Sequence, residues 1–290
     1  MSSAVRKTII GVVVVAVVVI AALFAVDTGL AISAENRLST SLRSGSGLDY
    51  DPEVTIGGFP FASSMRHHEY PRVGITARGV DLGDGRHGDL RSTLHEVSLP
   101  GNRWSVGPHD VLTVSDANGS LRLDSVNFGR FLGITDLTVT TPAPRDKAGG
   151  GGPGDGLLSA STGILTTGTV TVAPGLRRTV SVTVDLHVVD GALRVVATGF
   201  YSGPAEHASP DLDAAQRQAA LAAFTRTLPV LPLPWGMVAV KAHTEGSDVI
   251  LGGEFADAGS ADGSAREQTP RRLRAVEFFP RSARPTTSDL

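Results

Sequence analysis

The sequence has no cysteine and few aromatic residues. None of its 290 residues is Cys, and Phe, Trp and Tyr together make up 5%. The missing cysteine excludes disulfides, Cys-ligated zinc, iron–sulfur clusters, a thiol nucleophile and a lipidated N-terminal Cys. Lysine is also scarce, and the formal net charge is −3. Because a nucleic-acid-binding protein normally carries a strongly basic face, we expect no nucleic-acid partner.

Residues Ile9–Val26 form a charge-free run of 18 residues, of which 13 are Val, Ile, Leu or Phe. Their transfer free energies sum to roughly −4 to −8 kcal/mol in favour of membrane insertion. Two basic residues precede the run and Asp27 follows it. The positive-inside rule therefore predicts a single-pass anchor at 1–26, with a cytoplasmic N-terminus and the rest in the periplasm or cell envelope. The alternative is a signal peptide cleaved near Ala31–Ser33.

The following segment, 27–44, is predicted to be a juxtamembrane helix. Leu30, Ala34, Leu38 and Leu42 recur every four residues and would share one face. This helix would lead from the membrane into the domain.

From residue 45 to residue 257 the main hydrophobic period is two, which predicts antiparallel strands with one apolar face. In Thr179–Val188 apolar and polar residues alternate, and Asp190-Gly191 predicts a tight turn into a returning strand. Further strands are expected at 73–80 and 163–172, and hairpins around Asn118-Gly119 (111–126) and Glu245-Gly246 (237–255).

Two helical stretches, 125–133 and 210–228, interrupt the strands. The second is predicted to begin with Ser209 as its cap and Pro210 in its first turn. The Arg-rich tail, 258–290, is predicted to be disordered. The predicted fold class is α+β: a long curled antiparallel sheet with a few packed helices, behind an N-terminal transmembrane helix.

Motifs for catalysis or metal binding are nearly missing. The sequence has no Gly-x-Ser-x-Gly elbow, and its glycine-rich segment at 148–156 lacks the Gly-Lys-Ser/Thr of a phosphate-binding loop. His67-His68-Glu69 is interpreted as a surface turn, because adjacent side chains of a strand point to opposite faces. We therefore expect a protein that is not an enzyme, with no metal and no cofactor. A hydrolase with dispersed catalytic residues is the less favoured alternative.

Two apolar segments stand where neither a helix nor a central strand is expected. Gly57-Gly-Phe-Pro-Phe61 places two Phe around a proline, and 228–237 is an apolar run interrupted by prolines. One interpretation is that both segments close the ends of the core. The other is that they line or gate an apolar groove. Such a groove would hold an acyl chain with little polar chemistry, since each buried methylene contributes about 0.8 kcal/mol.

Five blocks of the sequence carry a family resemblance. They are Val54–Phe61 with its Gly-Phe-Pro-Phe, Tyr70–Val80, Leu94–Leu99, Leu121–Leu137 with its Phe-Gly-Arg-Phe-Leu-Gly, and Leu231-Pro-Leu-Pro-Trp-Gly-Met237. In this order the blocks resemble the actinobacterial LmeA-type phospholipid-binding family, also described as mannan chain length control proteins, over roughly residues 28–256. The resemblance implies an envelope protein that binds phospholipid and supports lipomannan elongation without being a glycosyltransferase. It also implies a tubular lipid-binding (TULIP-like) fold.

The candidate site residues come from these segments. The apolar residues expected to line the groove or contact the membrane are Phe59, Phe61, Met65, Phe128, Phe131, Leu132, Trp235 and Met237. Arg72 and Arg130 are the candidates for a lipid phosphate, because Arg offers a fork of hydrogen-bond donors.

The expected partners are a phospholipid or envelope glycolipid and the membrane itself, and a membrane mannosyltransferase is a further candidate. The alternative hypothesis is a protein-binding module in which the apolar segments contact a membrane glycosyltransferase.

Overall fold

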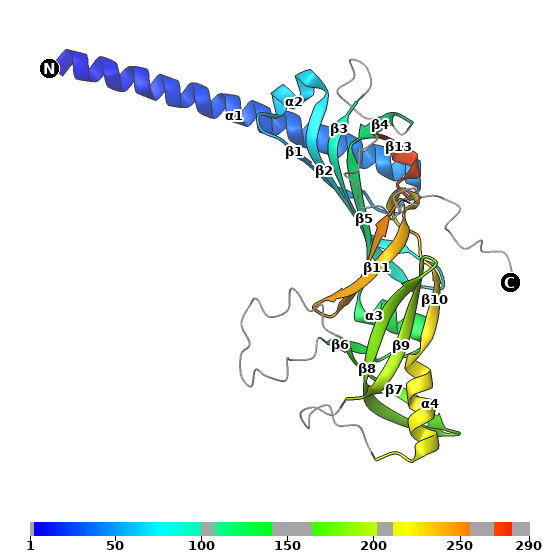
Figure 1. Cartoon of the computed structure of the whole chain (residues 1–290). Coiled ribbons are helices and arrows are strands. Elements are labelled where there is room, and N and C mark those ends of the chain that lie inside the picture. Colours follow the sequence, from blue (N-terminus) through cyan, green and yellow to red (C-terminus); the bar gives the residue numbers. More distant parts are fainter. Residues whose placement is uncertain are drawn as a thin grey trace, which may run out of the picture.

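The computed structural model describes residues 3–99, 107, 109–140, 164–201, 211–255 and 270–279, with side chains from residue 10 onward. Helix α1 (Ser3–Ser46) is continuous through both the apolar run and the predicted juxtamembrane helix. Its first half projects from the body of the molecule (Figure 1), and all residues from Ile10 to Val26 are exposed. In its second half Ala34, Leu38 and Leu42 are buried, which confirms the predicted apolar face.

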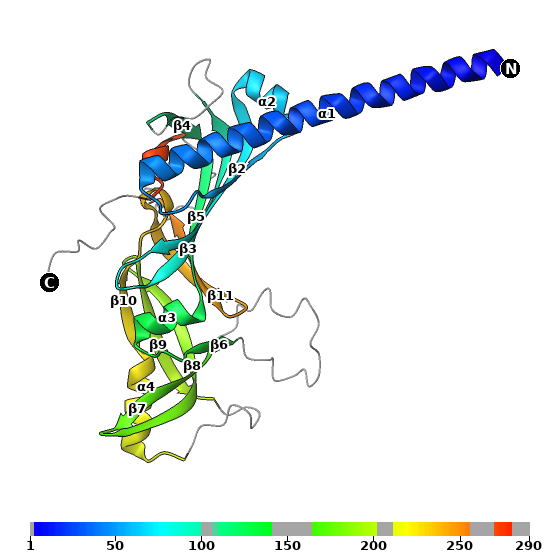
Figure 2. The same cartoon turned by 180° about the vertical axis from the view of Figure 1, so that it is seen from behind.

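The first sheet is antiparallel and has eight strands. Its main order is β1-β2-β3-β5-β12-β11, and β4 pairs with both β3 and β13. Helix α1 lies across one face of this sheet (Figures 1 and 2) and contacts β1 and α2 (Phe61–His67). The strands are β1 (Glu53–Gly57), β2 (Glu69–Asp81), β3 (His87–Ser98), β4 (Val111–Val114), β5 (Asp116–Leu123), β11 (Val238–Glu245), β12 (Asp248–Glu254) and β13 (Arg271–Arg274).

The second sheet is also antiparallel and has the order β10-β9-β8-β7-β6. Helix α4 (Ala214–Phe224) packs on β7 and β9 and buries Phe224. The strands are β6 (Thr138–Thr140), β7 (Ile164–Ala173), β8 (Leu176–Val189), β9 (Ala192–Phe200) and β10 (Arg226–Val230).

The two sheets follow one another along an elongated body, with α3 (Ser125–Leu132) near their junction (Figure 1). Helix α3 contacts β5 and β12 of the first sheet and β6 of the second, while β11 lies against β8 and β9. Two short 3-10 helices, η2 (Pro234–Gly236) and η4 (Ala275–Glu277), close the first sheet beside α1. One continuous apolar core runs through both sheets.

This architecture confirms the α+β class and corrects the prediction of one long curled sheet. The described strands form two sheets, neither closed nor strongly curled, and the tubular lipid-binding fold stays a prediction. The alternation of apolar residues predicts strands, but it carries no information on which strands share a ladder.

The hairpin predicted around Asn118-Gly119 is wrong, because both residues lie inside the single strand β5. A Cβ on Gly119 would stand 2.5 Å from the Met237 Sδ atom. The glycine therefore allows the chain of η2 and β11 to approach the strand, and it does not mark a turn.

The prediction of a disordered tail is wrong for residues 270–279, which include β13 and η4. Strand β13 pairs with β4, and Leu273, Phe278 and Phe279 are buried. The surrounding arginines and prolines mask this short apolar signal in the sequence. The other residues of the predicted tail lie outside the described part of the chain.

The helix predicted at 210–228 is shorter than expected. Asp213 caps α4 by accepting a hydrogen bond from Gln216 N, and the Gln216 side-chain oxygen accepts one from Asp213 N. This reciprocal pair sets the first turn. Leu228 belongs to β10, and the predicted cap at Ser209 and Pro210 lies outside the described residues.

Most other predicted elements are confirmed. Strand β8 contains 179–188, and the turn that follows has both Asp190 and Gly191 at positive φ. Strand β2 covers its predicted range, α3 ends one residue before the predicted 133, and β7 contains the predicted residues from 164 to 172. Strands β11 and β12 form the hairpin around Glu245-Gly246.

Candidate functional site

Helix α2 is joined to α1 at the point where the apolar run ends. The Asp27 carboxylate accepts hydrogen bonds from the backbone N–H groups of Phe61 and Ala62, at 2.9 and 2.8 Å. About one turn earlier in α1, the Phe24 ring stacks on the Phe59 ring, with centroids 4.9 Å apart. We call residues 57–68, the loop before α2 together with α2 itself, the foot. These contacts hold the foot against the last turn of the apolar run.

The two phenylalanines of the foot differ in exposure. Phe59 is 68% exposed, while Phe61 is 2% exposed and packs against the Tyr70 ring with centroids 5.8 Å apart. Phe61 thus attaches the foot to the core. Phe59 instead extends the exposed apolar surface of α1 through its contact with Phe24.

The second half of α1 is fixed to the domain by polar contacts as well as by its buried face. Glu35 Oε1 accepts a hydrogen bond from Ile56 N at 2.8 Å, and Ser39 Oγ donates to Pro52 O at 2.6 Å. At the far end of the helix, Ser46 Oγ donates to Ala275 O at 3.1 Å. The helix is therefore a core element over its second half and has no flexible linker to the domain.

A surface hollow of about 530 Å³ lies between the foot and the strands β2 and β3. Burial raises the pKa of the Tyr70 hydroxyl above its ordinary value of 10.0. Glu96, which also lines the hollow, has a positive φ of 50°. Most of the residues that line the hollow are polar or charged, and no cluster that could hold a metal ion occurs among the described residues. Its lining is Ser63, Ser64, His67, Glu69, Tyr70, Pro71, Glu96 and Ser98.

Apart from Phe59, the apolar residues singled out from the sequence lie in the core. Met65 is partly buried and packs against the core cluster. The Trp235 indole N–H donates to Ser92 Oγ at 2.8 Å, and its ring meets Phe278 edge-on. The buried members of this set are Phe61, Phe128, Phe131, Leu132, Trp235 and Met237. They belong to one continuous core, and none of them lines the hollow beside the foot.

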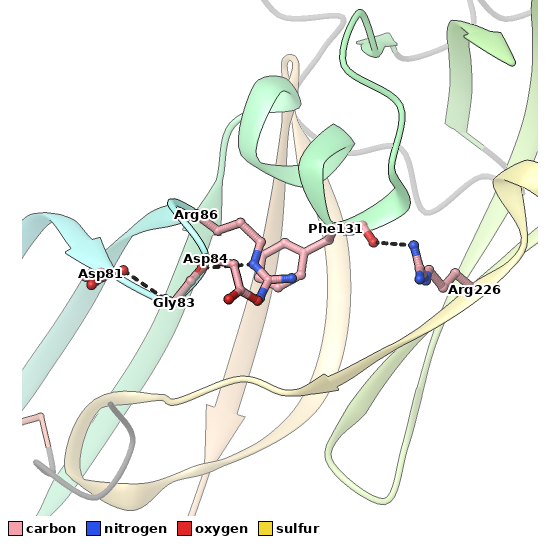
Figure 3. Close-up of polar contacts among 6 residues, drawn as sticks. All are labelled: Asp81, Gly83, Asp84, Arg86, Phe131 and Arg226. Carbon is pink, nitrogen blue, oxygen red and sulfur yellow. Dashed lines mark hydrogen bonds and ion pairs between the residues drawn. The ribbon is translucent and has the colours of Figure 1, made fainter. Parts of the chain in front are cut away.

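The ring of Phe131 is covered by an arginine from the turn between β2 and β3. The Arg86 guanidinium carbon lies 4.5 Å from the ring centroid (Figure 3), and the same side chain donates to Gly83 O at 3.0 Å and forms an ion pair with Asp84. Asp81 Oδ1 accepts from Gly83 N at 2.8 Å and shapes the turn. A cation over an aromatic face is favourable, so this turn is anchored on α3.

Two further arginines use backbone carbonyls at the junction of the sheets. Arg130 donates to Gly85 O at 2.6 Å, and Arg226 of β10 donates to Phe131 O at 3.1 Å (Figure 3). Together they link the first sheet, α3 and the second sheet. Arg130, a predicted phosphate ligand, therefore has a structural contact in this turn.

Arg72, the other predicted phosphate ligand, lies at the opposite end of β2. It is exposed and pairs with Gly57, the first residue of the foot. Asp81, at the end of β2 near Arg130, is nine positions further along the chain. Nine positions of extended strand span about 30 Å. The structure therefore places Arg72 beside Gly57, two residues before Phe59, and does not bring it together with Arg130.

The sequence reasoning missed the two residues of α1 that hold the foot. Phe24 was counted only as part of the apolar run, and Asp27 only as the charge that ends it. The available signal was an acidic residue directly after the apolar run, since a carboxylate there can accept from the free backbone N–H groups at the start of another helix.

Comparison with known proteins gives one finding. The family model described as LmeA-like phospholipid-binding matches residues 25–254. No curated protein and no solved structure matches the chain. The matched region begins within α1, two residues before Asp27, and ends with β12.

Proposed function

Because the chain belongs to the LmeA-like phospholipid-binding family, we propose that it is a membrane-anchored, extracytoplasmic phospholipid-binding protein with no catalytic role. The observation that carries this proposal is the joint between α1 and the foot. There an exposed apolar helix continues into the core, and an exposed Phe and an exposed Arg lie beside the point where it leaves the domain. This arrangement supports lipid contact close to a bilayer.

We propose that α1 is retained as an anchor. Among the described residues, α1 is the one helix long and apolar enough to cross a bilayer, and only 6% of its apolar stretch is buried inside the protein. Cleavage near Ala31–Ser33 would remove Asp27, which caps α2, together with Leu30, which packs against the core. The charges flanking the run favour a cytoplasmic N-terminus and an extracytoplasmic domain.

The proposed lipid-contacting residues fall into two groups. Phe59 and Arg72 are accessible and lie on neighbouring strand and loop positions. The buried members of the predicted set could contact an acyl chain only if the chain entered the core, and their lipid-binding role stays a prediction.

The direct test is to purify the full chain in a mild detergent and to identify retained lipids by mass spectrometry after solvent extraction. We expect a phospholipid in stoichiometric amount. A sample delipidated by repeated detergent washing serves as the control, and it should take up a fluorescent phospholipid. Loss of both signals would refute lipid binding, and breakdown of the lipid would instead support the hydrolase alternative.

We further propose, on the family resemblance, that the protein supports lipomannan elongation. Deleting the gene should shorten lipomannan chains, and re-expression of the full chain should restore their length. In-cell crosslinking from the foot tests the protein-partner alternative. A crosslink to a membrane mannosyltransferase, with no lipid recovered from the purified chain, would favour that alternative.

A further inference from the structure

The foot has an exposed apolar side chain at a depth that α1 defines. Phe59 stacks on Phe24, and Phe24 lies three residues before Asp27, the first charge after the apolar run. At 1.5 Å of rise per residue, Phe24 is about 4.5 Å further along the axis than Asp27, toward the apolar end. If α1 spans the bilayer, Phe59 therefore lies at the level of the outermost acyl carbons.

The polar groups of the foot lie toward the domain from this level, since the start of α2 bonds Asp27, and Ile56, next to Gly57, bonds Glu35 further along α1. Ser63, Arg66 and His67 are exposed on α2, and Arg72 is exposed on β2 next to Gly57. Glu69 is the exposed acidic residue among them. An apolar tip with cations behind it matches a leaflet, in which acyl chains lie beneath phosphates.

The foot cannot move independently of α1. The Asp27 carboxylate accepts from two backbone N–H groups at the start of α2, and Phe61 fixes the same segment to the core. The occupant of the exposed Phe59 surface must therefore lie beside the apolar half of α1. The bilayer that α1 crosses is continuous with that surface, and this continuity favours a leaflet over a separate protein.

We propose that the foot is a second membrane-docking surface, which inserts Phe59 into the outer leaflet next to α1 and holds the domain in one orientation on the bilayer. The proposal rests on the proposed anchoring of α1 and goes beyond it, since an anchor alone leaves the tilt of α1 and its rigidly attached domain in the bilayer undefined. It does not depend on whether the protein retains a lipid.

The absence of cysteine makes a site-specific test practical. Full chains carrying the single substitution Phe59→Cys or Tyr50→Cys would be labelled with a nitroxide and reconstituted into vesicles of phosphatidylcholine and phosphatidylglycerol. Tyr50 is the matched control: it is an aromatic residue with 74% exposure, located beyond the far end of α1. We expect the ratio of oxygen to nickel-chelate accessibility to be several-fold higher at position 59 than at position 50.

A second variant keeps the aromatic ring in place. Phe59→Trp should be quenched by phospholipids brominated near the top of their acyl chains, whereas Tyr50→Trp should not. Equal water accessibility at positions 59 and 50 would overturn the proposal, as would spin–spin broadening at 59 that shows a second copy covering this surface. Release of the chain from the vesicles by alkaline carbonate would refute the anchoring and the docking surface together. Phospholipid retained by the purified chain is measured separately, so a failure of lipid binding is distinguished from a failure of the docking surface.

Discussion

Arg72 and Arg78 are exposed arginines on the same strand, and they differ in their surroundings. Arg78 forms an ion pair with Glu53 at 2.9 Å, while Arg72 lies beside the foot. We predict that Arg72→Ala weakens binding of a short-chain fluorescent phospholipid about five-fold, because one basic residue near lipid phosphates contributes about 1 kcal/mol. Fluorescence titration of the full chain in micelles measures this change. Arg78→Ala is the control, and equal effects of the two substitutions would contradict a head-group role for Arg72.

Asp136, in the connection between α3 and β6, gives a pH-dependent prediction. Hydrogen bonds from the Thr169 hydroxyl and from Thr169 N lower the pKa of Asp136 below its ordinary value of 3.8. A carboxylate with a lowered folded-state pKa stabilises the fold above its unfolded-state pKa, and this contribution is lost as the pH falls through the folded-state pKa.

Asp136→Asn should therefore lower the free energy of unfolding at neutral pH by about 1 kcal/mol, a value reduced for the exposure of this side chain. Well below pH 3.8 the difference between the variant and the parent should vanish. Chemical unfolding followed by circular dichroism at both pH values measures it. A difference that stays constant with pH would show that the charge of Asp136 is not responsible.

At the scale of elements, the joint between α1 and α2 depends on one carboxylate. Asp27→Ala removes the acceptor of two backbone N–H groups in α2. We expect amide hydrogen exchange in residues 61–67 to accelerate about ten-fold, which corresponds to a loss of about 1.4 kcal/mol in local stability. Hydrogen-exchange mass spectrometry of the full chain measures this rate.

Thr28→Ala is the matched control for this substitution. The Thr28 hydroxyl donates only to Phe24 O within α1, at 2.9 Å. Its removal should leave exchange in α2 unchanged. Equal acceleration in both variants would mean that α2 responds to the stability of α1 in general.

The elements that the sequence predicts well are those whose own residues determine them. The alternation in β8 and the four-residue spacing in α1 are local patterns that match the buried faces of the structure. Gly119 shows where this reasoning fails. Its role depends on Met237, which is 118 residues away in the sequence, and the dipeptide Asn-Gly carries no trace of that contact.

The candidate site was predictable only in part for the same reason. Phe59 and Arg72 were named from their own sequence blocks, but the place of Arg72 beside Gly57, two residues before Phe59, follows from the pairing of β1 with β2. Trp235 and Phe128 have the apolar character expected of a groove, and that character is equally suited to a core. Burial separates these two roles, and burial depends on the complete fold.

At the scale of the whole molecule, the C-terminal residues 270–279 close the first sheet against the helix that begins the chain. Ser46 of α1 donates to Ala275 O, and Phe278 and Phe279 are buried nearby in the same core. We predict that a chain ending at residue 269 loses about 3–6 kcal/mol of stability, since each buried Phe contributes about 1.5–3 kcal/mol. This loss is comparable with the total stability of many proteins.

The matched control is a chain ending at residue 280, which keeps every described contact of β13 and η4. Urea unfolding of both chains in micelles gives the comparison. The same unfolding midpoint for both chains would show that the closing segment contributes little to the fold.

The continuity of α1 determines how often the domain contacts the lipids around it. A domain on a flexible linker samples a volume that grows with linker length, and its effective concentration at the surface falls accordingly. In this protein the helix that carries the exposed apolar run also carries the buried residues Leu38 and Leu42. Its last residue, Ser46, donates a hydrogen bond to Ala275 O. On the proposed anchoring, the position of the foot relative to the membrane-spanning half of α1 is fixed when the chain folds, so the foot reaches the leaflet without the search that a flexibly tethered domain makes.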